Sequence, residues 1–214
     1  MLTALLGFGA AAALIVLLPG PDTLVVVRNL LRGGRRRATA TASGVLSGLV
    51  VWVLAASLGV SALLRASHTG YDVLRYVGGA YLVWIGIQSL RSRALASQEL
   101  DTGAVAKTPR RYGPLLGSGY LAGLATDLLN PKVGVFFITF LPAFVPHNAR
   151  IGLTTLAFGA IFVAETLVYF VVLIRVADRV VGWMNDARIR RRLDRIAGAV
   201  FIAFGVRLAT ESGG

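Results

Sequence analysis

The chain has 214 residues, of which 56% are hydrophobic and only 15% are charged, and it contains 25 glycines and no cysteine. A soluble domain of this size would be about one quarter charged, so this composition excludes one. The lack of cysteine excludes disulfides, thiolate catalysis and cysteine-based metal or iron–sulfur sites. Apolar runs long enough to span a bilayer fill most of the sequence, which indicates an integral membrane protein.

Six apolar stretches predict six transmembrane helices, at residues 2–31, 39–64, 72–90, 115–141, 151–174 and 194–210. Residues 1–18 lack the basic start and the small-residue cleavage site of a signal peptide, so we expect them to remain as part of the first helix. The longest connection, 91–114, is too short for a separate domain. We therefore expect one all-α integral membrane domain over residues 1–214.

The net charge of +12 suggests nucleic-acid binding until the basic residues are located. The first, third and fifth connections between the predicted helices, together with the helix ends that flank them, hold 17 of the 22 lysines and arginines. This alternation is the positive-inside pattern, which places those three connections in the cytoplasm and both termini outside it. We therefore expect the lipid bilayer, and not a nucleic acid, as the partner of the basic residues.

The third and sixth predicted helices resemble each other. Gly79-Ala80, five residues and Gly86 match Gly198-Ala199, five residues and Gly205, at an offset of 119. The alternative explanation is that membrane helices rich in glycine and alanine look alike by composition alone. Pro19 and Pro131 argue against it, because they align the first and fourth helices at an offset near 112.

The repeat divides the chain into two halves, about 1–92 and about 115–210, separated by a cytoplasmic loop at 91–114. Each half contains three predicted helices, an odd number, so the second half must enter the membrane from the opposite side. The sequence therefore predicts a 3+3 inverted repeat, an architecture that supports alternating access in transporters.

Two proline motifs interrupt the first and fourth predicted helices. Proline removes a backbone donor and clashes with the preceding turn, so both helices are expected to be broken. The alternative is that the prolines mark helix ends near the membrane interface. Broken helices in corresponding positions of two repeats usually hold the substrate. The expected substrate-binding residues are therefore Pro19, Gly20, Pro21 and Asp22 in the first motif, and Asn130, Pro131 and Lys132 in the second.

Four ionisable residues, Asp22, Asp127, Lys132 and Glu165, fall within or at the edge of apolar segments. A charge near the bilayer centre costs roughly 3 kcal/mol on insertion scales, so each needs a partner, a water-filled cavity or a function. We predict that Asp22, Asp127 and Glu165 are the candidates for proton coupling. Each has a structural alternative: Asp22 as the cap of a helix starting at Thr23, Asp127 as an ion-pair partner of Lys132, and Glu165 as a hydrogen-bonding group.

Two glycine pairs, Gly44-x3-Gly48 and Gly119-x3-Gly123, are expected to let helices approach closely. A homodimer is one arrangement that such faces allow.

The motifs together resemble one family. Their order along the chain is Pro19-Gly20-Pro21-Asp22, Gly33-Gly34 before three arginines, Tyr81-Leu82-Val83-Trp84-Ile85-Gly86, and Leu129-Asn130-Pro131-Lys132 followed by Phe136-Phe137. In this order and spacing the chain is similar to the LysE/RhtB family of amino-acid exporters, from Leu17 to Leu208. The resemblance implies a bacterial inner-membrane protein that expels amino acids or close derivatives using the proton-motive force, with no cofactor. The first motif often ends in asparagine in that family, and Asp22 here adds a titratable group.

Export of an amino acid by proton antiport is therefore the leading hypothesis. A transporter of a metal ion or other small solute is the alternative, although no metal site is expected, because only three carboxylates are available in the membrane and Lys132 opposes a cation. An enzyme is not expected, since the two histidines, His68 and His147, both fall in predicted extracytoplasmic loops. A purely structural membrane protein would not need broken helices or membrane carboxyls.

Overall fold

A computed structural model describes residues 2–17, 19–66, 119–146 and 149–176, together with separate positions within 73–90 and 192–206. All regular elements in this described part are helical: α1 (Leu2–Leu17), α2 (Pro21–Ala66), α6 (Tyr120–Leu128), α7 (Pro131–Val135) and α8 (Ile151–Arg175). The chain continues from α7 through a π-helical turn, Phe136–Phe140, and a 3-10 turn, Leu141–Phe144. An all-helical, apolar chain is confirmed for these residues. About half of the residues in the predicted spans 72–90 and 194–210 lie outside them.

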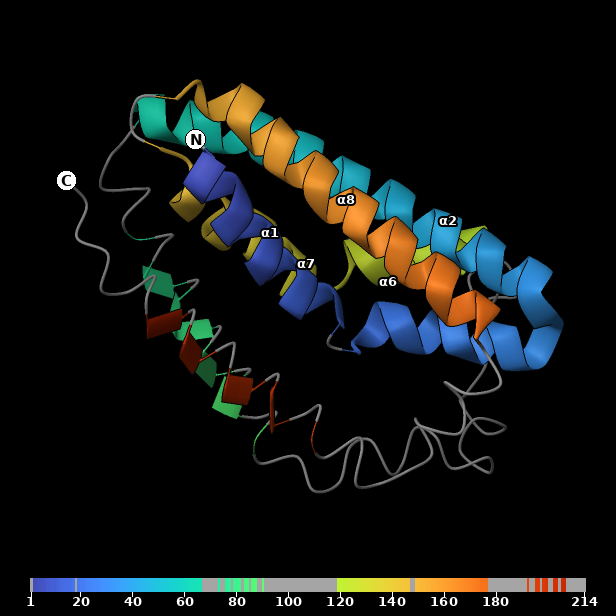
Figure 1. Cartoon of the computed structure of the whole chain (residues 1–214). Coiled ribbons are helices and arrows are strands. Elements are labelled where there is room, and N and C mark those ends of the chain that lie inside the picture. The colour runs from blue at the N-terminus through green and yellow to red at the C-terminus, as the bar shows by residue number, and fades with distance from the viewer. Residues whose placement is uncertain are drawn as a thin grey trace.

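The helix α2 consists of two arms joined at Gly34. Gly34 has φ 68° and ψ −173°, a left-handed backbone conformation that favours glycine. The arms then run back in opposite directions (Figure 1). The Asn29 amide donates a 2.9 Å hydrogen bond to Thr41 Oγ1 across this turn. The sequence predicted a polar connection between residues 31 and 39, and the structure replaces it with a reversal at a single residue.

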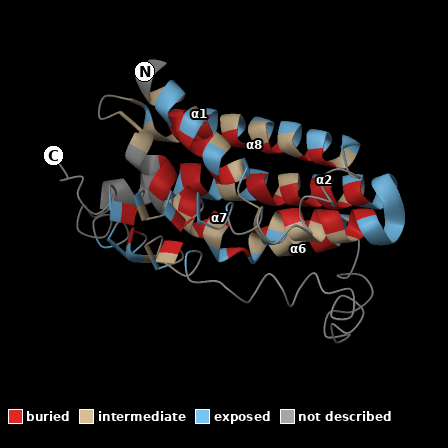
Figure 2. Cartoon of the chain, turned by 60° about the horizontal axis from the view of Figure 1, so that its bottom comes forward, coloured by how far each residue is buried: buried red, intermediate tan, exposed pale blue. Residues whose placement is uncertain are grey.

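The other helices surround the second arm of α2. Figure 1 shows α8 running beside this arm, with α1 and α7 lying along the bundle below them. One apolar core contains Phe8 of α1, Leu49 of α2, Phe137 and Phe158. A second core joins the two arms of α2 to the end of α8. Figure 2 shows that the buried residues face the spaces between these helices, whereas the turn of α2 is exposed.

The helices α2 and α6 cross at glycine. A Cβ atom on Gly44 would overlap the carbonyl oxygen of Tyr120 and would lie 2.8 Å from the backbone nitrogen of Leu124. A Cβ atom on Gly123 would overlap the carbonyl oxygen of Thr41 in the same way. The predicted role of Gly44 and Gly123 in close helix packing is therefore confirmed.

Gly119 behaves differently from the packing residue that the sequence predicted. It precedes α6 with φ 73°. Among the described residues, no atom lies within 4 Å of the Cβ position that it would carry. The glycine is therefore explained by the backbone conformation at the start of the helix and not by a helix crossing.

Replacing Gly44 by alanine is expected to lower stability by about 1–3 kcal/mol, because the added methyl group meets backbone that cannot rotate away. Gly59 on the same arm of α2 is the matched control, since no described atom lies within 4 Å of its Cβ position. Thermal unfolding of the two purified alanine variants in detergent measures the difference. Equal unfolding temperatures for both variants would show that α2 and α6 are not packed as closely at Gly44 as the structure indicates.

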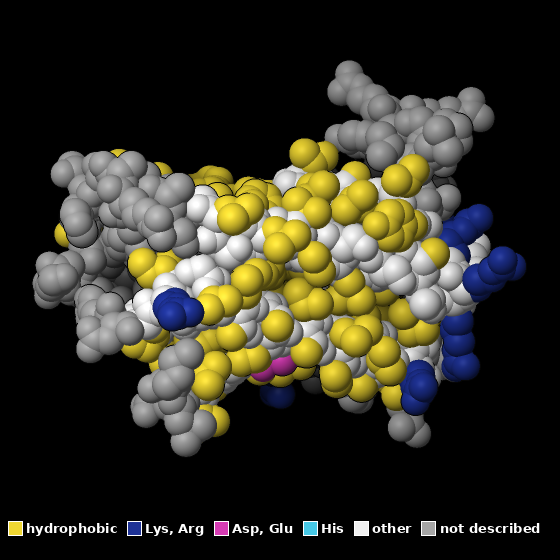
Figure 3. All heavy atoms as spheres, turned by 90° about the horizontal axis from the view of Figure 1, so that it is seen from above, with side chains coloured by type: hydrophobic (Ala, Val, Ile, Leu, Met, Phe, Trp, Pro, Cys, Tyr) yellow, Lys and Arg dark blue, Asp and Glu magenta, His cyan; other side chains and the backbone are white. Residues whose placement is uncertain are grey.

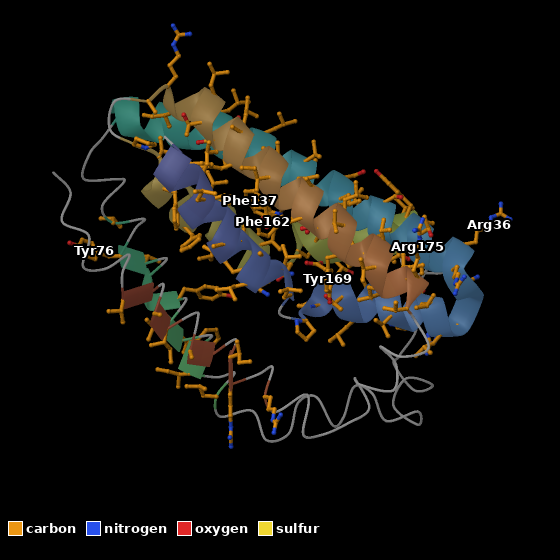
Figure 4. The ribbon with its side chains drawn as sticks, in the orientation of Figure 1. Arg36, Tyr76, Phe137, Phe162, Tyr169 and Arg175 are labelled. Atoms are coloured by element: carbon orange, nitrogen blue, oxygen red, sulfur yellow. The ribbon has the colours of Figure 1, made fainter. Side chains whose placement is uncertain are left out.

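Several helices are suited to a bilayer. Pro21–Gly59 and Ile151–Arg175 are each long and apolar enough to span one, and Tyr120–Leu128 with Pro131–Ile138 forms a further apolar pair bent by 53°. Figure 3 shows hydrophobic side chains over the middle of one face of the molecule and most of the visible Lys and Arg side chains at one end. Arg36 and Arg175 both lie at one end of the bundle (Figure 4). This distribution is that of a membrane protein with one strongly basic end.

Two stretches that the sequence aligned as a repeat meet in the structure. A Cβ atom on Gly86 would lie 2.7 Å from the carbonyl oxygen of Gly198, and one on Gly198 would lie 2.6 Å from that of Gly86. A Cβ atom on Gly205 would lie 2.6 Å from the carbonyl oxygen of Gly79. The repeated glycines therefore contact each other in a reciprocal pattern.

Candidate functional site

The first interruption in the bundle lies between α1 and α2. The helix α1 ends at Leu17 and α2 begins at Pro21. Proline is favoured at the first position of a helix, because its missing N–H would have no partner there. The first hydrogen bond of the new helix joins the nitrogen of Leu24 to the carbonyl oxygen of Gly20. The N–H groups of Asp22 and Thr23 have no partner within α2, and they point toward its N-terminal end.

The second interruption lies between α6 and α7. The helix α6 ends at Leu128, and α7 begins at Pro131 with Asn130 as its N-cap. The side-chain oxygen of Asn130 accepts a 3.1 Å hydrogen bond from the nitrogen of Lys132. Asparagine is a favoured N-cap because it satisfies one of the free N–H groups in this way. Both interruptions therefore end at a helix that starts with proline.

A side-chain hydrogen bond joins the two interruptions. Asn130 Nδ2 donates to Asp22 Oδ2 at 2.8 Å, across 108 residues of sequence. Lys132 and Asp22 also interact electrostatically, and a Cβ atom on Gly20 would lie 3.6 Å from Lys132 Nζ. The structure thus brings together Gly20, Asp22, Asn130 and Lys132, which the sequence placed in two separate motifs.

A pocket opens at this junction, with about 490 Å³ of space that no atom fills, part of it open to the outside. One group of lining side chains is polar: Asp22, Thr23, Asn130, Lys132, Thr166 and Tyr169. The others are apolar and include Ile15, Leu49, Phe136 and Phe162. Among the described residues, the pocket therefore combines a negative group, a positive group, hydroxyl groups and an apolar wall.

The remaining predicted site residues differ in their positions. Pro19 and Pro21 flank Gly20 in the first interruption, and Pro131 starts α7, but none of the three lines the pocket. Asp127 is fully buried beside Gly48 of α2 and lies outside the pocket lining. Glu165 is half-buried and also lies outside it.

Glu165 points toward α1. Its Oε1 would lie 3.6 Å from a Cβ atom on Gly9. Its Oε2 is buried and has no hydrogen-bond partner among the described residues. Glu165 therefore does not line the pocket that contains Asp22, and its role in proton coupling stays a prediction.

The structural alternatives for the two aspartates were a helix cap for Asp22 and an ion pair with Lys132 for Asp127. The helix α2 begins at Pro21 and not at Thr23, and Asp22 accepts its hydrogen bond from Asn130, so Asp22 is not a cap of the expected kind. Asp127 has no hydrogen-bond partner for either carboxyl oxygen within the described chain. Lys132 is instead an electrostatic partner of Asp22.

Three polar lining residues were not predicted: Thr23, Thr166 and Tyr169. Tyr169 Oη donates to Thr23 Oγ1 at 3.4 Å, which joins α8 to the start of α2. Figure 4 shows Tyr169 nearer than Phe162 to the end that holds Arg175. Phe162, Thr166 and Tyr169 are spaced by four and three residues, so they share one face of α8. This spacing is the signal in the sequence that could have identified Thr166 and Tyr169, whereas Thr23 has no such signal.

The described residues contain no group of three or more His, Asp or Glu side chains able to hold a metal ion. The positive charge of Lys132 in the pocket would also repel a metal cation. The arrangement is suited to a small molecule that carries both a negative and a positive group.

Comparison with known proteins identifies relatives along most of the chain. The LysE type translocator family matches residues 13–212. A membrane protein of Pseudomonas aeruginosa without assigned function is 36% identical over 205 residues, 92% of this chain and 91% of the relative. A threonine efflux protein of Salmonella typhi is 31% identical over 194 residues, 89% of each chain. A homoserine/homoserine lactone efflux protein of Salmonella typhimurium is 26% identical over 200 residues, 93% of this chain and 92% of the relative. No solved structure matches the chain.

Proposed function

The chain belongs to the LysE type translocator family, and we propose that it exports a small amino acid across the bacterial inner membrane in exchange for protons. Members of this family are transporters and not enzymes. Relatives that cover most of the chain are named for the efflux of threonine and of homoserine or homoserine lactone. Threonine and homoserine are small amino acids with uncharged side chains, and a substrate of this kind is the first choice for this protein.

The observation that carries the proposal is the pairing of Asp22 with Lys132 in one pocket. A free amino acid carries an ammonium and a carboxylate group on the same carbon. Asp22 is the ligand for the ammonium group, and Lys132 is the ligand for the carboxylate. The free N–H groups at the start of α2 add positive potential toward the carboxylate.

Asn130 holds the two ligands in place. Its side-chain oxygen is occupied by the Lys132 backbone, and its side-chain nitrogen by Asp22. We therefore assign Asn130 a positioning role, in place of the direct substrate contact that the sequence predicted. Pro19, Pro21 and Pro131 act by starting or interrupting helices and contribute no ligand atom.

The transport mechanism in this proposal is alternating access by two inverted repeats of three helices. The reciprocal glycine contacts support it. The repeat aligns Gly79 with Gly198 and Gly86 with Gly205, and the contacts link Gly79 to Gly205 and Gly86 to Gly198. Reciprocal contacts of this kind are what a two-fold axis produces. The basic turn of α2 then faces the cytoplasm.

The proposal is tested by efflux of a labelled amino-acid panel from liposomes containing the purified protein, with and without an imposed pH gradient. We expect gradient-dependent efflux of threonine or homoserine and little movement of arginine or lysine, because the pocket already contains a cation. Transport of divalent metal ions in place of amino acids would favour the alternative of a metal or other small-solute transporter.

A further inference from the structure

Asp127 is a carboxyl group in an unusual setting. It is 0% exposed, and both of its carboxyl oxygens are buried without a hydrogen-bond partner among the described residues. Its side chain lies under Gly48 of α2, where a Cβ atom would overlap the carboxyl group. Trp52 Nε1 donates a 3.3 Å hydrogen bond to the Asp127 carbonyl oxygen and fixes this turn of α6. Gly48 therefore provides the space in which the carboxyl group fits.

In this buried setting the Asp127 carboxyl group is expected to bind a proton. A carboxyl group without water or a partner is far less costly as the neutral acid than as the anion. The part of α2 that covers it contributes Gly48 and Trp52, neither of which titrates near neutral pH. The charged group that acts on Asp127 is Asp22, at the start of α2. On α7 the charged group is Lys132, which acts on Asp22.

Among the described residues, hydrogen bonds connect the backbone of Asp127, and not its carboxyl group, with the pocket. The backbone nitrogen of Asn130 donates to the Asp127 carbonyl oxygen at 3.0 Å. The side chain of the same Asn130 donates to Asp22. These hydrogen bonds lie at the bend between α6 and α7, which contains Leu129 and Asn130. A change in this bend would therefore alter both the burial of Asp127 and the position of Asp22.

We propose that Asp127 is the proton-binding carboxyl of the transport cycle and that Asp22 is reserved for the substrate, an inference that depends on the amino-acid/proton antiport proposed above. When the bend opens toward the cytoplasm, Asp127 releases its proton. Its negative charge then adds to that of Asp22 and favours binding of the substrate ammonium group. When the site opens to the outside, a proton returns to Asp127, the second charge is lost and the substrate leaves. The closed site with a neutral Asp127 is the state that carries the proton inward.

Asp127→Asn separates the two roles, because asparagine imitates the protonated acid and cannot release the proton. Two assays use the variant in liposomes with threonine as the probe: exchange of internal for external threonine, which needs no net proton movement, and efflux driven by a pH gradient. We expect exchange to continue, with a KM roughly tenfold higher and independent of pH, within the usual range of coupling between two sites. We expect the pH gradient to have no effect on efflux.

Glu165→Gln is the matched comparison, because within the described helices Glu165 is the other carboxyl outside the pocket. It is expected to respond to the pH gradient as the original protein does. Gradient-driven efflux by Asp127→Asn, or its loss in Glu165→Gln alone, would overturn the proposal. If the original protein moves no amino acid in either assay, the proposed function fails instead, and the two failures are thus distinguishable.

A second measurement covers the case in which Asp127→Asn does not fold. Infrared difference spectra of the original protein labelled with 13C-aspartate report protonated aspartates directly. We expect a protonated aspartate band at neutral pH that disappears when threonine binds, and that is present at neutral pH in Asp22→Asn as well. The absence of this band in the original protein, or its loss in Asp22→Asn, would contradict the assignment to Asp127.

Discussion

Replacing Asp22 by asparagine is expected to reduce amino-acid transport by about a hundredfold or more while the protein stays folded and inserted. Asparagine has the same size and still accepts the hydrogen bond from Asn130, so the junction between the two interruptions is retained. The variant loses the negative charge that faces the substrate ammonium group. Removal of one partner from a buried charge pair costs roughly 2–5 kcal/mol, which corresponds to at least about 30-fold in affinity.

The measurement is threonine exchange in liposomes, with thermal unfolding of the purified variant as the control for folding. Exchange is the appropriate assay because it requires substrate binding but no proton gradient. Asp22→Glu retains the charge on a longer side chain, and we expect it to retain more activity than Asp22→Asn. Exchange by Asp22→Asn close to that of the original protein would remove Asp22 from the substrate site.

Replacing Lys132 by glutamine is expected to have a second large effect, again about a hundredfold on exchange, because the substrate carboxylate loses its only charged side-chain partner among the pocket residues described. The loss is specific to the carboxylate. An amine analogue of threonine that lacks the carboxylate should bind weakly and equally to the original protein and to Lys132→Gln.

Competition of that amine with labelled threonine measures the difference. Lys132→Arg retains the positive charge and is the matched control, although its larger head must fit beside Gly20. An unchanged KM for threonine in Lys132→Gln would show that the carboxylate binds elsewhere, for example at the helix N-termini alone.

Much of the junction could be predicted from local sequence because proline acts on the backbone next to it. Pro21 and Pro131 determine where new helices start, and Asp22, Asn130 and Lys132 lie within two residues of these starts. Two proline motifs, each at the start of a helix, were therefore enough to indicate residues that meet in the structure. The contact between Asp22 and Asn130 could be expected in this way although 108 residues separate them in the sequence.

Other features could not be predicted, because they depend on which helix faces pack against one another. The hydropathy of the sequence does not specify this packing. Gly34 reverses the chain within what reads as a polar connection, because left-handed geometry at one glycine replaces a loop. Glu165 and Thr166 are neighbours in sequence, yet only Thr166 lines the pocket, since successive residues of a helix point in different directions. Tyr169 lies in an apolar run of the sequence, and the position of α2 is what shows that its hydroxyl group reaches Thr23.

Proton movement driven by the exported amino acid is the most direct test of amino-acid/proton antiport. Liposomes containing the protein and a trapped pH-sensitive dye are loaded with threonine and diluted into threonine-free buffer of the same pH. Antiport predicts that outward threonine movement acidifies the interior, and that Asp127→Asn abolishes this acidification while threonine exchange continues. Threonine efflux without any acidification in the original protein would contradict proton antiport and leave a uniporter on the same fold.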